Sequence, residues 1–117
     1  RRDLADDREQ MAHYEIPEID LVIVDLYPFE ATVASGASDA DIIEKIDIGG
    51  ISLIRAGAKN HKDVVIVSSK ADYQPLLDIV KAQGAETTLE QRKQFATNAF
   101  ATSSHYDTAI HAWFSKN

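Results

Sequence analysis

A stretch in the middle of the chain, residues 45–61, combines residue types suited to chemistry on a carbonyl or a phosphate. It places the carboxylate of Asp47 shortly before the glycine pair 49–50, with Arg55 and Lys59 further along. A glycine pair lets the backbone approach a ligand closely, and a helix that starts there presents unpaired N–H groups and the positive end of its dipole. The stretch therefore predicts half of an active site.

The helix expected from about residue 50 to residue 59 gives the polar side chains a common face. Ser52, Arg55 and Lys59 are three and four residues apart, so they project from the same side of the helix. The apolar residues between them lie largely off that side and can hold the helix to a core. The polar face is then able to meet a ligand, although a stripe of cations is also typical of a solvated helix surface.

Each candidate also has an ordinary structural role. Asp47 could act as a general acid or base, or it could cap the helix that follows it. Lys59 suits the last turn of a helix, where a cation interacts with the negative end of the dipole. Tyr27 could be a core aromatic residue at the end of a strand, or its phenol could orient a substrate group. Asn60 and His61 most simply end the helix.

Several chemistries find no support in the sequence. The chain has no cysteine, which excludes disulfides, thiolate catalysis and cysteine-bound zinc within these residues. His105 and His111 are six residues apart rather than four, so they do not share a helix face suited to a metal, and no metal site is expected. Glycine-rich phosphate-binding motifs and the G-x-S-x-G motif of serine hydrolases are absent from the sequence.

The charge of the chain favours a small ligand over a polymer. The net charge of −7 argues against a nucleic-acid surface, which normally carries a basic excess. Residues 45–62 are locally basic, and a basic pocket in an acidic protein suits a small anionic ligand. No stretch is apolar enough to cross a membrane and no leader is visible, so we expect a cytoplasmic enzyme. Because the sequence begins at Arg1, we expect a piece of a longer protein.

Two continuous apolar runs predict the strands that position these residues. Residues 19–26 and 64–67 are rich in β-branched residues, which is typical of strands buried on both faces of a parallel sheet. Asp25 and Tyr27 lie at the carboxyl end of the first run, where ligands bind in open parallel sheets. Strands that alternate with helices indicate an α/β layer architecture.

Helices are expected in the remaining segments. They are a short acidic helix or extended arm at 3–14, and helices at 28–35, from 38 or 39 to 45, at about 50–59, at 70–82 and from 88 onward. Ser38 or Asp39 can cap the third of these, and Thr88 with Gln91 forms a capping-box pattern. Residues 103–105 leave open a division of the last helix into two. Its apolar stripe is more typical of a core or a subunit interface than of a cofactor site.

Three sequence words in a fixed order carry a resemblance to a known family. They are residues 25–29 (Asp-Leu-Tyr-Pro-Phe), 44–50 (Glu-Lys-Ile-Asp-Ile-Gly-Gly) and 55–61 (Arg-Ala-Gly-Ala-Lys-Asn-His). Together they resemble the cyclohydrolase domain of bifunctional purine biosynthesis proteins, the AICAR transformylase/IMP cyclohydrolases. The similarity continues through residues 71–73, 88–92, 106–107 and 113–114, so it covers nearly the whole chain.

This resemblance implies a methylglyoxal-synthase-like α/β fold, with a mostly parallel sheet layered with helices. Residues 1–87 would form the C-terminal part of that domain, and residues 88–117 a helical extension of it. The first strands of the family's domain would precede Arg1, so the chain looks like an incomplete domain. The phosphate-binding loops and another catalytic lysine would lie there too, and we expect little or no activity from this chain alone.

The implied activity is the dehydrative ring closure of 5-formamidoimidazole-4-carboxamide ribotide to IMP. By resemblance, Lys59 stabilises the formyl oxygen and helps it leave as water, Asp47 moves protons at the attacking nitrogen, and Tyr27 positions the substrate. The residues implied in substrate binding are Asp25, Leu26, Ile48, Gly49, Gly50, Arg55 and Asn60. The backbone N–H groups of residues 48–50 would bind the base edge. The family often has Asn in place of Asp25, which puts an amide-donor role there in doubt.

The resemblance also implies the partners. The cyclohydrolase step needs no metal or redox cofactor, and a 10-formyl-tetrahydrofolate donor is implied only for a transformylase domain after residue 117. The ligand would be a small purine ribotide, without nucleic acid or membrane, and the enzyme is expected to be a homodimer. Two alternatives stay open: a non-catalytic effector-binding module of the methylglyoxal-synthase-like type, and an inert structural or dimerisation fragment built on residues 88–114.

Overall fold

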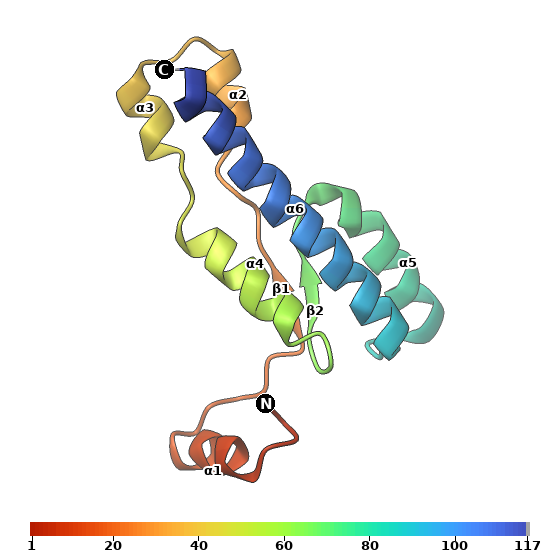
Figure 1. Cartoon of the computed structure of the whole chain (residues 1–117). Helices are drawn as coiled ribbons and strands as arrows, with labels where there is room; N and C mark the ends of the chain where they lie inside the picture. Colours follow the sequence, from red (N-terminus) through yellow and green to blue (C-terminus); the bar gives the residue numbers. More distant parts are fainter. Residues whose placement is uncertain (117) are drawn as a thin grey trace.

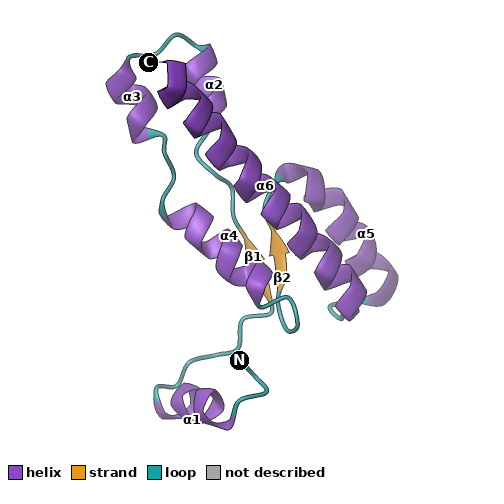
Figure 2. Cartoon of the chain, in the orientation of Figure 1, coloured by secondary structure: helices purple, strands orange, loops and turns teal. Residues whose placement is uncertain are grey.

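Strands and helices alternate along the chain, as the α/β prediction requires. The computed structural model describes residues 1–116. In chain order the elements are α1 (Ala5–His13), β1 (Leu21–Ile23), α2 (Phe29–Ala34), α3 (Asp39–Glu44), α4 (Gly49–Lys59), β2 (Val65–Val67), the 3-10 helix η1 (Lys70–Asp72), α5 (Tyr73–Gln83) and α6 (Leu89–Lys116). Figure 1 shows their course from the N-terminus to the C-terminus. Figure 2 shows one short pair of strands next to the helices α4 and α6.

The two strands form a parallel pair. Backbone hydrogen bonds extend the pairing beyond both strands: the Val65 N–H donates to the Asp20 carbonyl and the Val24 N–H to the Val67 carbonyl, each at 2.9 Å. Parallel neighbours need a crossover connection, which is supplied here by α2, α3 and α4. The prediction that both apolar runs form strands of a parallel sheet is confirmed.

The strands differ in burial. β2 is buried along its whole length, as predicted. In β1 only Val22 packs against the core, while Leu21 and Ile23 are 44% and 52% exposed. The prediction that the first run is buried on both faces is therefore wrong for the described residues. Its physical reason is that one face of β1 contacts the core shared with α4 and α6, whereas the side chains of the other face meet solvent.

The main core lies between the sheet and the helices α4 and α6. Ile54 and Ala58 of α4 and Phe95 and Ala99 of α6 pack with Ile66 of β2, and each is at most 4% exposed. The alanines let the two helices approach each other and the sheet closely. Figure 1 shows α4 and α6 side by side next to the strands. This core fixes the position of α4, which carries most of the predicted site.

α6 is one continuous helix of 28 residues, without the division that was left open at residues 103–105. Ser103 is only 2% exposed, so its small side chain packs inside the fold instead of ending the helix. The Thr102 hydroxyl donates to a carbonyl four residues earlier at 3.1 Å, which satisfies it within the helix. At the start of α6, Thr88 and Gln91 form the predicted capping box, with hydrogen bonds of 3.1 and 2.8 Å.

A second cluster joins α2 and α3 to the end of α6. The ring of Phe29 meets the rings of Tyr106 and Trp113 edge to face, with centroids 6.2 Å apart in both pairs. Ser38 caps α3 as predicted, because its hydroxyl oxygen accepts the Asp41 N–H at 3.2 Å. This cluster places Tyr106 next to the loops that lead into and out of the predicted site.

The N-terminal arm contains the predicted short acidic helix, α1, and none of its residues is buried. Ion pairs tie the arm to the main body, with Arg2 2.9 Å from Asp20 and Lys62 3.2 Å from Asp3. Figure 1 shows α1 apart from the other helices. In the described part of the chain, no helix is both long and apolar enough to cross a membrane.

Candidate active site

The Asp47 carboxylate joins the start of α4 to the segment that follows β1. Its Oδ1 accepts a hydrogen bond from the Gly50 N–H at 2.6 Å, and its Oδ2 accepts one from the Tyr27 N–H at 3.1 Å. The helix-capping role that the sequence left open is therefore present. Capping does not exclude proton transfer, because each carboxylate oxygen has a second lone pair. The carboxylate is thus fixed while it keeps the capacity to bind a substrate group.

The second glycine of the pair is required by this carboxylate. A Cβ at Gly50 would lie 2.7 and 2.8 Å from the two Asp47 oxygens, closer than van der Waals contact allows. A Cβ at Gly49 would meet no atom within 4 Å. Gly50 therefore admits Asp47, and its N–H is already engaged. Of the three backbone N–H groups predicted to bind the base edge, those of Ile48 and Gly49 are left for a ligand.

The Tyr27 side chain is open to solvent next to this end of α4. It is 56% exposed, so it does not have the core role that the sequence left open. The Lys45 Nζ lies 5.6 Å from the centroid of the Tyr27 ring, within cation–π range. Ile48, at the N-cap of α4, is 75% exposed. A ligand here would meet a phenol, an ammonium group, an apolar side chain and the positive end of the helix dipole.

Lys59 and Asn60 lie at the other end of α4. The helix has 11 residues, and at a rise of ~1.5 Å per residue its ends are about 15 Å apart. Lys59 is its last residue and is exposed, and Asn60 is its C-cap. Arg55 lies against α6, with its guanidinium carbon 5.7 Å from the centroid of the Phe100 ring. The structure therefore does not bring these three predicted residues to the Asp47 end of the helix.

Asp25 and Leu26 line a cavity at the carboxyl ends of the strands, where the sequence predicted ligand-binding residues. The cavity has a volume of about 590 Å³. Asp25 lies 3.8 Å from the Lys70 Nζ, and a second pair, Glu30 with His105, has its nitrogen and oxygen 2.8 Å apart. The sequence does not indicate Lys70, Glu30 or His105 as residues of a ligand site. Their separations of 45 and 75 residues form no local pattern that could have shown them.

Tyr106 also contributes to the site around Asp47, although the sequence does not indicate it as a site residue. Its hydroxyl accepts a hydrogen bond from the Asp47 N–H at 2.9 Å and donates one to the Lys45 carbonyl at 2.7 Å. Burial raises the pKa of the Tyr106 phenol above its ordinary value, although the hydrogen bond from the Asp47 backbone acts in the opposite direction. In the sequence, Tyr106 belongs to the apolar stripe expected after residue 88 and to residues 106–107 of the family resemblance, and neither indicates a contact with Asp47. The available signal was its hydroxyl, because a buried tyrosine usually has a polar partner.

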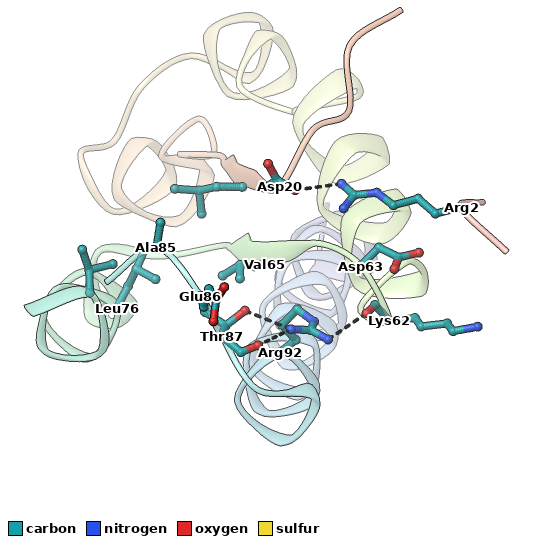
Figure 3. Close-up of a pocket in the computed structure, with 12 residues that line it drawn as sticks. Arg2, Asp20, Lys62, Asp63, Val65, Leu76, Ala85, Glu86, Thr87 and Arg92 are labelled. Atoms are coloured by element: carbon teal, nitrogen blue, oxygen red, sulfur yellow. Dashed lines mark hydrogen bonds and ion pairs between the residues drawn. The ribbon is translucent and has the colours of Figure 1, made fainter. Parts of the chain in front are cut away.

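A further cavity, of about 470 Å³, lies at the amino ends of the strands (Figure 3). The Arg92 guanidinium donates to three backbone carbonyl oxygens there, those of His61, Lys62 and Thr87. Arg2 is paired with the carboxylates of Glu18 and Asp20. These cations therefore stabilise the fold instead of awaiting an anionic ligand. In the described part of the chain, no three His, Asp or Glu side chains are grouped to hold a metal ion.

Comparison with known proteins matches two family models to different parts of the chain. The family model for the AICARFT/IMPCHase bienzyme matches residues 57–117, and the model for the MGS-like domain matches residues 3–52. In a crystal structure of ForH, the matching fold superposes with a TM-score of 0.72 at 30% sequence identity, covering 96% of this chain and 58% of that one. The parallel sheet layered with helices is therefore that of an MGS-like domain, as predicted.

Curated relatives belong to the family that the first of these models describes. The chain is 69% identical over 114 residues to the bifunctional purine biosynthesis protein PurH of Bacteroides thetaiotaomicron and 54% identical over 113 residues to that of Rhodospirillum rubrum. Each match covers 97% of this chain and 22% of the relative, so the chain spans about a fifth of the length of these proteins. The chain belongs to the family of the AICARFT/IMPCHase bienzyme.

Proposed function

We propose that this chain supplies part of the IMP cyclohydrolase site of a bifunctional purine biosynthesis enzyme. The observation that carries the proposal is the Asp47 carboxylate held between the start of α4 and the Tyr27 backbone, in a chain of this family. The substrate is 5-formamidoimidazole-4-carboxamide ribotide and the product is IMP. Residues outside this chain bind the ribotide phosphate in this proposal.

The reaction is intramolecular, so the proximity of the reacting groups is already built into the substrate. The carboxamide nitrogen attacks the formyl carbon, and the new C–N bond closes the ring. The formyl oxygen then leaves as water after it has taken one proton from each of the two nitrogens. The protein has to hold the reactive rotamer, move these protons and stabilise charge on the formyl oxygen.

The geometry supports some assignments more than others. Asp47 suits proton transfer at the attacking nitrogen, because two backbone N–H groups hold its carboxylate in place. The exposed Tyr27 phenol is available to position the substrate. Lys59, assigned to the formyl oxygen, lies about 15 Å along α4 from its start, which exceeds the length of a lysine side chain. Its role therefore rests on family resemblance alone.

The test uses a chimera in which this chain replaces the matching segment of the Bacteroides thetaiotaomicron PurH, hereafter the PurH chimera. Conversion of the formylated ribotide is followed for the chimera and for its Asp47→Ala and Lys59→Ala variants. Lys81→Ala, on the exposed side of α5, is the control. We expect turnover by the chimera and a large loss in Asp47→Ala. Near-unchanged rates for both Asp47→Ala and Lys59→Ala would overturn the proposal.

Two further measurements concern the activity of the chain alone and the oligomeric state of the enzyme. Purified residues 1–117 are expected to show little or no ring closure, and robust turnover by them would contradict the proposed division of the site. A homodimer is part of the proposal, since Phe100 and Phe114 of α6 are 42% and 54% exposed. Light scattering of the PurH chimera measures that state directly.

A second candidate is an effector-binding module without catalysis. The MGS-like match and the cavity beside Asp25 favour it, because that cavity is open to a polar ligand at the carboxyl ends of the strands. It predicts that the PurH chimera binds the ribotide, measured by calorimetry, without converting it. An inert structural fragment predicts neither binding nor turnover.

A further inference from the structure

The Tyr106 hydroxyl connects two backbone segments of the proposed site. It accepts the Asp47 N–H at 2.9 Å and donates to the Lys45 carbonyl at 2.7 Å. The Tyr27 carbonyl oxygen lies 3.4 Å away and is the more distant acceptor. Tyr106 is 59 residues from Asp47 and 79 from Tyr27 along the chain, so these contacts depend on the tertiary fold.

The ring that carries this hydroxyl is itself held in place. Tyr106 is 7% exposed, and its ring meets that of Phe29 edge to face. It belongs to the continuous helix α6, which packs against α4 and β2 through the main core. A residue in such surroundings has little freedom to move, and it transfers that rigidity to the groups it contacts.

We infer that Tyr106 is a positioning residue for the proposed ring-closing site: its hydroxyl fixes the backbone on both sides of Ile46 and thereby aims the Asp47 carboxylate at Gly50 and Tyr27. The inference rests on the proposed function. Tyr106 does not touch the reacting atoms. It acts through Asp47, whose own N–H it accepts and whose side chain would carry out the proton transfer.

The first experiment compares Tyr106→Phe with Tyr14→Phe in the PurH chimera. Tyr106→Phe keeps the ring and its packing but leaves the Asp47 N–H and the Lys45 carbonyl, both at part-buried hydrogen bonds, without this partner. Misplacing a catalytic group by about 1 Å can cost on the order of 100-fold, so we expect kcat to fall about 10- to 100-fold with a much smaller change in KM. Tyr14 is 67% exposed on the N-terminal arm, and its variant should keep both constants.

A purely structural tyrosine would lower the melting temperature and leave the kcat of the folded protein unchanged. A double-mutant cycle with Asp47→Asn separates the two roles. If Tyr106 acts through Asp47, Tyr106→Phe will have little further effect on kcat once Asp47 has lost its carboxylate. Independent effects that multiply in the double variant would overturn the inference.

A second variant covers the case in which Tyr106→Phe does not fold. A 3,5-difluorotyrosine at position 106 keeps the ring and the hydroxyl, but its phenol ionises at lower pH than that of tyrosine. We expect its kcat to fall at a pH where the unmodified chimera is still fully active, because the phenolate cannot donate to the Lys45 carbonyl. An unchanged pH profile, or an unchanged kcat in a folded Tyr106→Phe, would overturn this inference alone. Failure of the unmodified chimera to turn over would overturn the proposed function and the inference with it.

Discussion

The two ends of α4 are both held by α6, but by contacts with different consequences. At the start of α4, Tyr106 bonds the backbone that carries Asp47, and the Asp47 carboxylate bonds two further N–H groups. At its other end, Arg92 bonds the carbonyls of residues 61–62, while Lys59 is exposed. The first set of contacts aims a carboxylate, whereas the second closes the turn into β2. Of the two site residues implied by the family resemblance, the structure therefore supports Asp47, which contacts several elements, more than the exposed Lys59.

The sharpest test of this comparison is the pair Asp47→Asn and Lys59→Ala in the PurH chimera. General acid–base catalysis contributes about 10²- to 10⁴-fold, and we expect Asp47→Asn to lower kcat by an amount in that range. Lys59→Ala should lower kcat less, because Lys59 lies at the opposite end of the helix. Steady-state kinetics of both variants measure the difference. Equal losses would break the comparison and would require a ligand, or a second chain, that reaches both ends.

The glycine pair offers a test confined to the first end. Gly50→Ala places a methyl group less than 3 Å from the Asp47 oxygens, so the carboxylate must move and kcat should fall about 10- to 100-fold. Gly49→Ala is the matched variant, because its methyl group meets open space and should cost much less. If both variants lose activity equally, then a close approach of ligand to the backbone is the constraint, and the position of Asp47 is not.

The sequence predicted the features of the fold that depend on neighbouring residues. Asp47 precedes the first turn of α4, and Ser38, Thr88 and Gln91 cap their helices, since each hydrogen bond spans only three residues. The continuous hydrophobicity of the two apolar runs also predicted that they are strands of a parallel sheet. Local periodicity and capping chemistry are sufficient for such features.

What the sequence missed depends on distant contacts. The partners of the Tyr106 hydroxyl are 59 or more residues away, and the solvent-exposed face of β1 depends on which elements pack on it. The position of Lys59 does not depend on distant contacts, because its distance from the start of α4 follows from the helical rise alone. The spacing of Arg55 and Lys59 predicts a shared face of the helix, but a shared face does not bring both residues to its first turn. The roles of Lys59 and Arg55 in the site stay predictions.

The second end of α4 should respond in stability before it responds in activity. Arg92→Met removes hydrogen bonds from a charged group to the carbonyls of His61, Lys62 and Thr87, and we expect it to lower the free energy of unfolding by about 2 kcal/mol. Lys93→Met, on the exposed side of α6, is the control. Urea denaturation of the PurH chimera measures the change. A loss of kcat in folded Arg92→Met as large as in Asp47→Asn would give this end a catalytic role.

The smallest expected effect concerns the arm beside the second end. Hydrogen bonds from Arg1 and Lys62 hold the pKa of the Asp3 carboxyl well below its usual range. A lowered pKa means that this contribution to stability is present above the unfolded value of about 4 and is lost as the pH falls further. Since the group is exposed, we expect Asp3→Asn to lower the melting temperature slightly at pH 7 and by a smaller amount at pH 2, with Asp6→Asn as the control. A difference that persists in 1 M salt would contradict a surface ion pair.

Because Tyr106 and Arg92 of α6 contact the two ends of α4, they also limit where residues can be inserted or deleted in the chain. Arg92 and Tyr106 are 14 residues apart on one continuous helix, a spacing of about 21 Å. One inserted or deleted residue between them would turn Tyr106 by about 100° relative to Arg92, and the helix has no loop there to absorb the change. Insertions and deletions among relatives should therefore fall in the loop 84–88 before α6, and the 92–106 interval should keep its length while its exposed side chains vary.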